Sequence, residues 1–223
     1  ALCVGCAAGF YLPGVSPKTY KRGERMPVKV NKLTSTQTEL PYDYYSLPFV
    51  EPSKGVVQSP ENLGEYLMGT RIENSPYEVF MLRNENCKLL ARQVLGKEEQ
   101  EAFVQSIRDG YHANFIFDNL PSAAAIDDEE TRTQTTVYDI GYPVGTVRVH
   151  KGVTKGIMLN NHLKFSIDYH PVGRVDRVVA AGRIVGFLIE PISVQHKYEG
   201  EWDPKAGASQ LTSCYRNRPM PPL

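Results

Sequence analysis

The side chains best suited to hold a metal ion gather between His162 and His170. His162, Asp168 and His170 fall on one parity of a predicted strand, and the apolar positions fall on the other. Those apolar positions are Leu163, Phe165 and Ile167. Metal ligands must converge at about 2 Å from the ion, whereas strand positions roughly six to eight apart are too distant to do so. We therefore predict no metal site and interpret the polar set as a solvent-facing row. His196 lies in another alternating run and is predicted to be a half-buried histidine with a partner.

Signatures of enzymatic chemistry are missing from the sequence. It contains no G-x-S-x-G, no H-E-x-x-H and no G-x-x-x-x-G-K-[ST] motif. Glu190 and Asp203 each precede a proline, but neither has a visible acid–base partner. The basic run 151–156 precedes a strand pattern rather than a helix, so it is predicted to be a hairpin loop and not a phosphate site. The acidic run 127–130 lacks the spacing of a calcium loop. We predict a protein without enzymatic activity or cofactor.

The single tryptophan, Trp202, offers the one candidate platform for a ligand. An exposed aromatic ring could stack on a sugar, which would make the chain a secreted carbohydrate- or protein-binding module. The favoured interpretation is that Trp202 covers one end of the fold. The binding module stays open as the alternative function.

Composition sets the class of protein. The chain has 223 residues, with 25 basic and 25 acidic side chains, so no net charge would attract nucleic acid. Its 41% hydrophobic and 10% aromatic content predicts a folded domain with a sizeable core. It holds no apolar run of about eighteen residues, so no segment is expected to cross a bilayer as a helix.

Alternating patterns predict an all-β fold. Apolar residues alternate with others around residues 26–30, 77–81, 163–169 and 185–189. Together with the strand 113–118 and the β-rich segments after Thr135, they predict about eight to ten strands in an antiparallel sandwich. One amphipathic helix is predicted over 97–109, with Phe103, Val104 and Ile107 on its buried face and Gly110 after it.

We interpret the stretch from Leu40 to Tyr77 as the one around which the rest of the chain is organised. Its first part, residues 40–49, is rich in tyrosine and bracketed by prolines, which predicts extended backbone. Its second part predicts a short helical crossover over 60–68, with Leu63 and Leu67 as a docking stripe and Gly69 as the left-handed residue at its end. We interpret Leu63, Leu67, Gly69 and Tyr77 as a structural motif.

Motifs along nearly the whole chain resemble the N-terminal lumenal domain of the nonaspanins, the transmembrane nine superfamily. In chain order they are FYLPGVSPKTYKRGE, VKVNKLTS, YDYYSLPF, ENLGE-x-L-x-G-x-RIENSPY, DNLP, GYPVG, NNHLKFSIDYH, RIVGFLIEPISVQHKYEGEWD and LTSC. The resemblance implies nine membrane spans after this domain. Their absence implies a fragment, an isolated ectodomain or a natural truncation.

The resemblance also implies a domain plan and a role. Residues 1–9 are expected to be the remnant of a signal peptide, 10–214 the lumenal domain, and 215–223 an extended or disordered tail. The family resemblance implies Golgi or endosomal membranes, and a part in the sorting or surface delivery of other membrane proteins. Expected partners are that cargo and the protein's own membrane domain, with no nucleic acid and no small-molecule substrate.

The family pattern further implies a disulfide between Cys87 and Cys214. Cys3 and Cys6 would leave with the signal peptide. The nonaspanin pattern places two more cysteines where this chain has Val50 and Ala91, and their joint absence is what a lost disulfide leaves behind. Cys87 and Cys214 would then be each other's only partner. The alternative is a buried Cys87 with a free or intermolecular Cys214.

Overall fold

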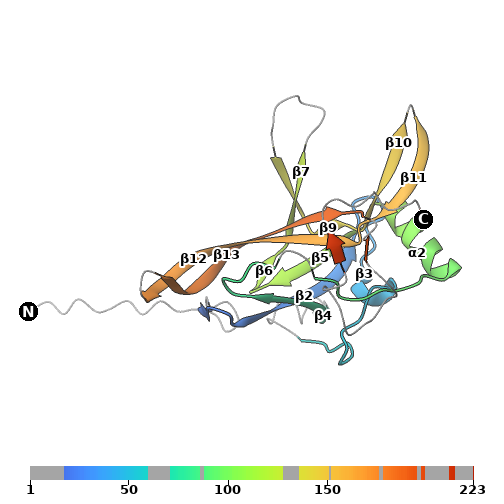
Figure 1. The fold of residues 1–223 in the computed structure, drawn as a ribbon. Helices are drawn as coiled ribbons and strands as arrows, with labels where there is room; N and C mark the ends of the chain where they lie inside the picture. The colour runs from blue at the N-terminus through green and yellow to red at the C-terminus, as the bar shows by residue number, and fades with distance from the viewer. Residues whose placement is uncertain are drawn as a thin grey trace, which may run out of the picture.

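Two β-sheets organise the chain in the computed structural model, which describes residues 18–59, 71–85, 88–127, 136–150, 152–175, 178–194, 197–198, 211–213 and 223 (Figure 1). The predicted signal remnant 1–9, the crossover helix 60–68 and all but the last residue of the tail 215–223 lie outside the described residues. The division into those segments therefore stays a prediction.

The first sheet is built around one long strand. It contains β2 (Arg25–Thr34), β3 (Tyr42–Asp43), β4 (Glu73–Phe80), β5 (His112–Phe117), β6 (Leu120–Pro121) and β9 (Tyr142–Pro143). All its pairings are antiparallel, with β2 bonded to β3 and β4 on one side and to β5 on the other. Met26, Val28 and Val30 are buried and alternate with more exposed neighbours, which is the pattern that the sequence predicted.

The second sheet is dominated by one long hairpin. It contains β1 (Tyr20–Lys21), β7 (Ala123–Asp127), β8 (Thr136–Ile140), β12 (His162–Val175) and β13 (Val178–Ile192). β12 and β13 pair antiparallel along almost their whole length, with a register shift between Asp168 and Tyr169. One pairing, between β13 and β7 at Leu188 and Ala123, is parallel. The sandwich is thus antiparallel except at that contact.

Aromatic side chains from both sheets meet in a shared core. Phe115 of β5 is fully buried, and Phe117 of the same strand lies 5.0 Å, between ring centroids, from Phe187 of β13. Tyr77 of β4 contacts Phe165 of β12 at 5.4 Å. These rings join the faces of the two sheets, so the structure confirms the all-β sandwich.

Helix α2 (Lys97–Arg108) docks against this body, as the sequence predicted to within one residue at its end. The Glu99 side chain accepts a hydrogen bond from the Gly96 backbone N–H at 2.7 Å, which satisfies a donor at the helix start. Phe103 and Ile107 are buried. Gly110 follows with a φ of +66°. Within the described residues no helix is long and apolar enough to cross a membrane.

Several local predictions need correction. Residues 44–46 form a 3-10 turn, η1 (Tyr44–Ser46), inside the stretch predicted to be extended, because the Ser46 hydroxyl donates to the Asp43 carbonyl at 2.7 Å. The hairpin loop predicted over 151–156 is shorter, since β11 (Val153–Leu159) already pairs with β10 (Gly145–His150) from Val153.

The described residues contain fifteen strands rather than about ten. Several of them are pairings of only two or three residues, too short to produce an alternating pattern in the sequence. They include β14 (Lys197–Tyr198) and β15 (Leu211–Ser213), which form a small sheet of their own.

Candidate functional site

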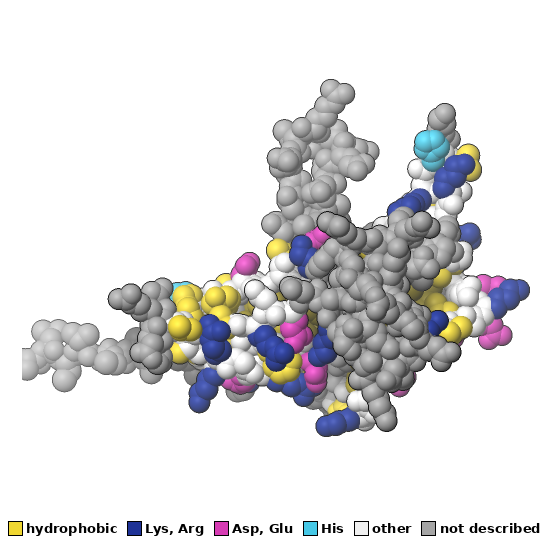
Figure 2. All heavy atoms as spheres, viewed as in Figure 1, with side chains coloured by type: hydrophobic (Ala, Val, Ile, Leu, Met, Phe, Trp, Pro, Cys, Tyr) yellow, Lys and Arg dark blue, Asp and Glu magenta, His cyan; other side chains and the backbone are white. Residues whose placement is uncertain are grey.

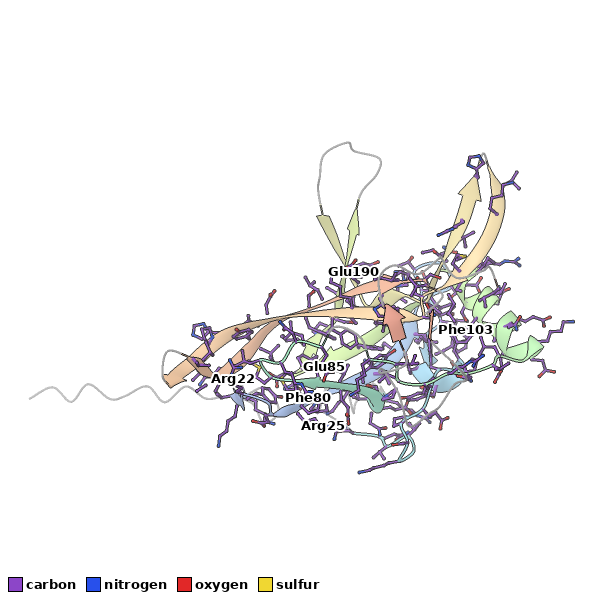
Figure 3. The ribbon with its side chains drawn as sticks, viewed as in Figure 1. Arg22, Arg25, Phe80, Glu85, Phe103 and Glu190 are labelled. Carbon is purple, nitrogen blue, oxygen red and sulfur yellow. The ribbon has the colours of Figure 1, made fainter. Side chains whose placement is uncertain are left out.

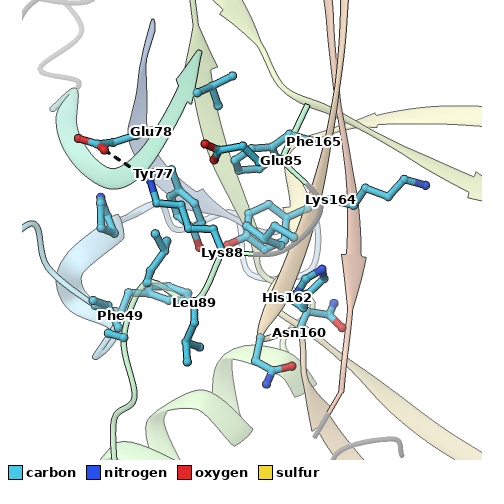
Figure 4. Close-up of a pocket in the computed structure, with 18 of the residues that line it drawn as sticks. Phe49, Tyr77, Glu78, Glu85, Lys88, Leu89, Asn160, His162, Lys164 and Phe165 are labelled. Carbon is cyan, nitrogen blue, oxygen red and sulfur yellow. Dashed lines mark hydrogen bonds and ion pairs between the residues drawn. The ribbon is translucent and has the colours of Figure 1, made fainter. Parts of the chain in front are cut away.

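A groove of about 860 Å³ opens between β4 of the first sheet and β12 of the second. Its third wall is the connecting segment between β4 and α2, of which residues 81–85, 88–93 and 95 line the cavity. Figure 4 shows Tyr77 and Glu78 on the β4 side, Lys88 and Leu89 on the connecting segment, and His162 and Phe165 on the β12 side. Two sheets and a connection that belongs to neither thus form one cavity.

The groove touches the edges of both strands, and not only their faces. It is lined by five consecutive residues of β4, Pro76–Phe80, and by four consecutive residues of β12, His162–Phe165. Successive side chains of a strand point to opposite faces, so a cavity that meets both parities lies along the edge. Among the described strands, β12 pairs only with β13 and β4 only with β2. Within the described residues, the edge of β4 is bridged to residues 57–58 at Glu73 and Asn74, so the edge that borders the groove is that of residues 76–80, together with residues 162–165 of β12.

Aromatic rings form the floor. Tyr44 of η1 is buried and stacks on Phe49 at 4.4 Å between ring centroids. Phe49 meets Phe103 of α2 edge-on at 5.2 Å, which connects the floor to the helix. Tyr142 of β9 and Tyr77 complete it. The large apolar area of these rings suits an apolar ligand.

Three tyrosine hydroxyls provide the polar groups of this aromatic floor. Tyr44 and Tyr142 share a hydrogen bond, and burial raises the pKa of each hydroxyl well above its usual range, with a further rise in the Tyr44 pKa from the Tyr142 charge. Burial raises the pKa of Tyr77 in the same way. The three phenols stay neutral at physiological pH, so they can donate and accept hydrogen bonds but cannot act as bases.

The charged side chains at the rim are paired with one another. Arg25 and Lys88 both bind Glu78, at 2.8 Å and 3.5 Å, and Arg25 lies beside its register partner Phe80 (Figure 3). Arg83 lies 3.6 Å from Glu85, and the Lys164 ammonium group pairs with Glu190 of β13 at 2.6 Å. Exposed pairs of this kind contribute little to stability. They also present no unpaired acid–base couple to the cavity.

The candidate metal residues lie partly as predicted. Asp168 and His170 are exposed, but His162 is half-buried and lines the groove. The register shift at Asp168 and Tyr169 breaks the parity of the strand, which leaves Tyr169 40% exposed next to His170. In the described part of the chain, no group of three His, Cys, Asp or Glu side chains could hold a metal ion.

Of the residues predicted as the structural motif, the ligand platform or the disulfide, Tyr77 has a described position, and it lines the groove. Leu63, Leu67, Gly69, Trp202, Cys87, Cys214 and His196 lie outside the described residues. The docked crossover helix, the ligand platform and the disulfide therefore stay predictions. Sequence reasoning missed the groove itself, because its walls come from segments more than eighty residues apart and only the pairing of strands brings them together.

One buried carboxyl beside the site lacks a partner for one of its oxygens. Glu73, at the start of β4, is 6% exposed, and its Oε2 atom accepts no hydrogen bond from any described residue. Burial raises the pKa of Glu73 above its ordinary value of 4.5, and the nearby Asp43 raises it further against the opposing effect of Arg71. The folded protein therefore binds this proton more tightly than the unfolded chain does.

The free energy of unfolding of the parent is expected to fall as the pH rises through the folded-state pKa of Glu73. We expect the Glu73→Gln variant to lack this fall. The contribution of Glu73 is fully present below the unfolded-state pKa and is lost as the pH rises from about 4.5 through the higher folded-state pKa. Urea unfolding at several values between pH 4 and pH 8 measures this, with the exposed Glu101→Gln as control. A parent and a Glu73→Gln variant with parallel pH profiles would contradict the assignment.

Sequence comparison connects this geometry to known proteins. A sequence model of the Endomembrane protein 70 family matches residues 41–219. The chain belongs to this family. Transmembrane 9 superfamily member 8 of Arabidopsis thaliana is 46% identical over 209 residues, which are 93% of this chain and 31% of that relative. Member 9 of the same plant is 44% identical over 216 residues, 96% of this chain and 32% of the relative.

The match extends beyond plants. Human transmembrane 9 superfamily member 4 is 34% identical over 200 residues, which are 84% of this chain and 30% of that protein. The resemblance to the nonaspanin N-terminal domain is thereby confirmed. The chain spans about a third of the length of these relatives. No solved structure matches it significantly.

Two positions of the family pattern lie at the groove. Val50 and Ala91, the two positions at which the resemblance implies family cysteines, both line the groove. The structure thus brings these positions, forty residues apart in the chain, to the same cavity.

Proposed function

We propose that this chain is a non-enzymatic lumenal domain of a Golgi or endosomal membrane protein, and that it takes part in the sorting or surface delivery of other membrane proteins. Membership in a family of membrane proteins supports the location at a membrane. The groove supports a binding role, because its rim charges are internally paired and its tyrosines stay protonated, which leaves apolar contact and hydrogen bonding as its chemistry.

The single observation that carries the proposal is the position of the groove along two strand edges. An exposed strand edge can hydrogen-bond an extended peptide, which then joins the sheet as an added strand. The aromatic floor would receive every second side chain of such a peptide. We propose that the ligand is an extended, apolar segment of another membrane protein, held beside β12 or β4.

Filling the groove should weaken this binding and leave the fold intact. Ala91 is half-buried and lines the groove, whereas Val94, on the same connecting segment, is 85% exposed and does not. Ala91→Trp is expected to occupy ligand space and to reduce peptide affinity about tenfold or more, the loss of about 1.4 kcal/mol of contact. Val94→Trp introduces the same ring outside the cavity and serves as the matched control.

Two readouts test the proposal. Purified parent, Ala91→Trp and Val94→Trp proteins are applied to an array of short peptides tiled from the non-cytosolic segments of membrane proteins of the source organism. In cells, the same substitutions are placed in the gene, the product is located with Golgi and endosome markers, and surface proteins are quantified by biotinylation. Selective loss with Ala91→Trp supports the proposal. Equal behaviour of both variants, or a product absent from these compartments, would overturn it.

A further inference from the structure

The register of the long hairpin determines which backbone groups of β12 face the groove. Leu163 of β12 lies opposite Pro191 of β13. A hydrogen-bonded antiparallel pair exchanges two N–H···O=C bonds, and Pro191 has no N–H to donate, so these two residues form a non-hydrogen-bonded pair. The N–H and C=O of Leu163 therefore point away from β13. Phe165, two residues further along the same unbroken register, has the same orientation.

These four groups, the N–H and C=O of Leu163 and of Phe165, form an open edge at the groove. Both residues line the cavity, and no second described strand pairs with β12 on this side. Within the described part of the chain, no turn or loop hydrogen bond reaches these groups either. Free N–H and C=O groups on every second residue are what an added strand needs to extend a sheet.

The facing edge of β4 is less complete. Glu78 lies opposite Pro27, so the same argument turns the N–H and C=O of Glu78 towards the groove. Two residues earlier, however, Pro76 has no N–H, and two residues later the Phe80 carbonyl accepts a hydrogen bond from the Arg83 N–H at 3.2 Å. A register shift also interrupts the pairing of β4 with β2 in this stretch. The regular open edge at the groove is therefore that of β12.

The two faces of this edge differ in polarity. The side chains of Leu163 and Phe165 pack against the core, and the Phe165 ring lies 5.4 Å from that of Tyr77 in the groove floor. Lys164, between them, is exposed and pairs with Glu190. Basic and acidic side chains are interspersed on the visible face of the molecule in Figure 2. Apolar contact on one face, rather than charge, would therefore select a ligand.

We infer that β12 is the edge that receives the ligand, and that the ligand is an extended segment with apolar side chains at alternate positions. Its backbone bonds the four groups of Leu163 and Phe165. Its apolar side chains lie on the face of these two residues, and the side chains between them lie beside Lys164 in water. The inference rests on the proposed function, to which it adds the strand, the bonding groups and the sequence pattern of the ligand.

Two synthetic peptides of one composition test the pattern. The probe is Lys-Ser-Val-Ser-Val-Ser-Lys with a terminal fluorophore, and the control is Lys-Ser-Ser-Val-Val-Ser-Lys. Fluorescence anisotropy with the purified chain should show about tenfold tighter binding of the alternating peptide, because only its valines share one face. N-methylation removes backbone donors without changing a side chain. Methylation of the two valines should weaken an antiparallel ligand about tenfold, and methylation of the serines should do so for a parallel one.

Proline substitution identifies the strand. Leu163→Pro removes an open N–H but no bond to β13, whereas the control Leu163→Ala shortens the same side chain and keeps the N–H. Glu78→Pro and Glu78→Ala form the corresponding pair on β4. We expect Leu163→Pro to bind the alternating peptide about tenfold more weakly than Leu163→Ala, and the two Glu78 variants to bind alike.

Hydrogen exchange of the unsubstituted chain gives an answer that does not depend on how the proline variants fold. The alternating peptide should slow exchange at the Leu163 and Phe165 amides and leave the Glu78 amide unchanged. Protection of Glu78 instead, equal affinity for the two peptides or for their N-methylated forms, or no binding would overturn the inference.

Failure of the inference and failure of the proposed function give different results. Peptides from membrane proteins that bind in a manner sensitive to Ala91→Trp, but protect neither Leu163 nor Phe165, would overturn the inference and leave the proposed function standing. Binding of the alternating peptide at β12, with surface proteins unaffected in cells, would support the inference and overturn the sorting role alone.

Discussion

Replacing Phe115 with alanine is expected to lower the free energy of unfolding by about 3–5 kcal/mol. Phe115 is fully buried on β5, and its ring contacts four other aromatic rings. They are Tyr44 at 5.7 Å, Tyr77 at 5.4 Å, Tyr142 at 5.2 Å and Phe165 at 6.3 Å. Because these partners come from η1, both sheets and the groove floor, truncation would leave a cavity where the layers meet.

Urea unfolding followed by circular dichroism measures the change. Val185→Ala is the control, since Val185 is 61% exposed on β13 and its truncation should change stability by less than about 0.5 kcal/mol. A Phe115→Ala variant within about 1 kcal/mol of the parent would show that the two sheets do not share one core.

Sequence patterns were enough to predict the strands and the helix in which buried side chains repeat at a regular spacing. Phe103 and Ile107 are four residues apart and both lie on the buried face of α2. Met26, Val28 and Val30 follow the two-residue period of a half-buried strand, and β2 confirms it. In each case a single neighbouring layer determines which side chains are buried, so the sequence carries the signal directly.

The groove could not be predicted in that way. Its edges depend on which strands lie side by side, and the alternation of apolar and polar residues does not say which strands are neighbours. The exposed position of Tyr169 likewise follows from the register shift between Asp168 and Tyr169 in β12, which the residue types in that stretch do not predict. Long-range pairing, rather than propensity, decides these features.

The second large effect is expected at Gly141, where the chain crosses from β8 in one sheet to β9 in the other. Gly141 has a φ of +78°, which other residues adopt at a cost of about 1–2 kcal/mol. A Cβ at this position would also lie 2.7 Å from the Ala113 carbonyl oxygen and 2.4 Å from Asn114 Oδ1. The Asn114 side chain can move, but the backbone of β5 cannot do so without disturbing its pairing. We therefore expect Gly141→Ala to destabilise the protein by about 3 kcal/mol or more.

Gly23→Ala separates the two causes of this effect. Gly23 has nearly the same backbone conformation, with a φ of +76°, but no atom lies within 4 Å of a Cβ built there. It should therefore lose only about 1–2 kcal/mol in the same urea experiment. The difference between the two variants measures the close approach of Gly141 to β5, which also sets the position of Tyr142 in the groove floor. Equal losses would mean that the crossover can shift away from Ala113, and that the floor of the groove is not held at this point.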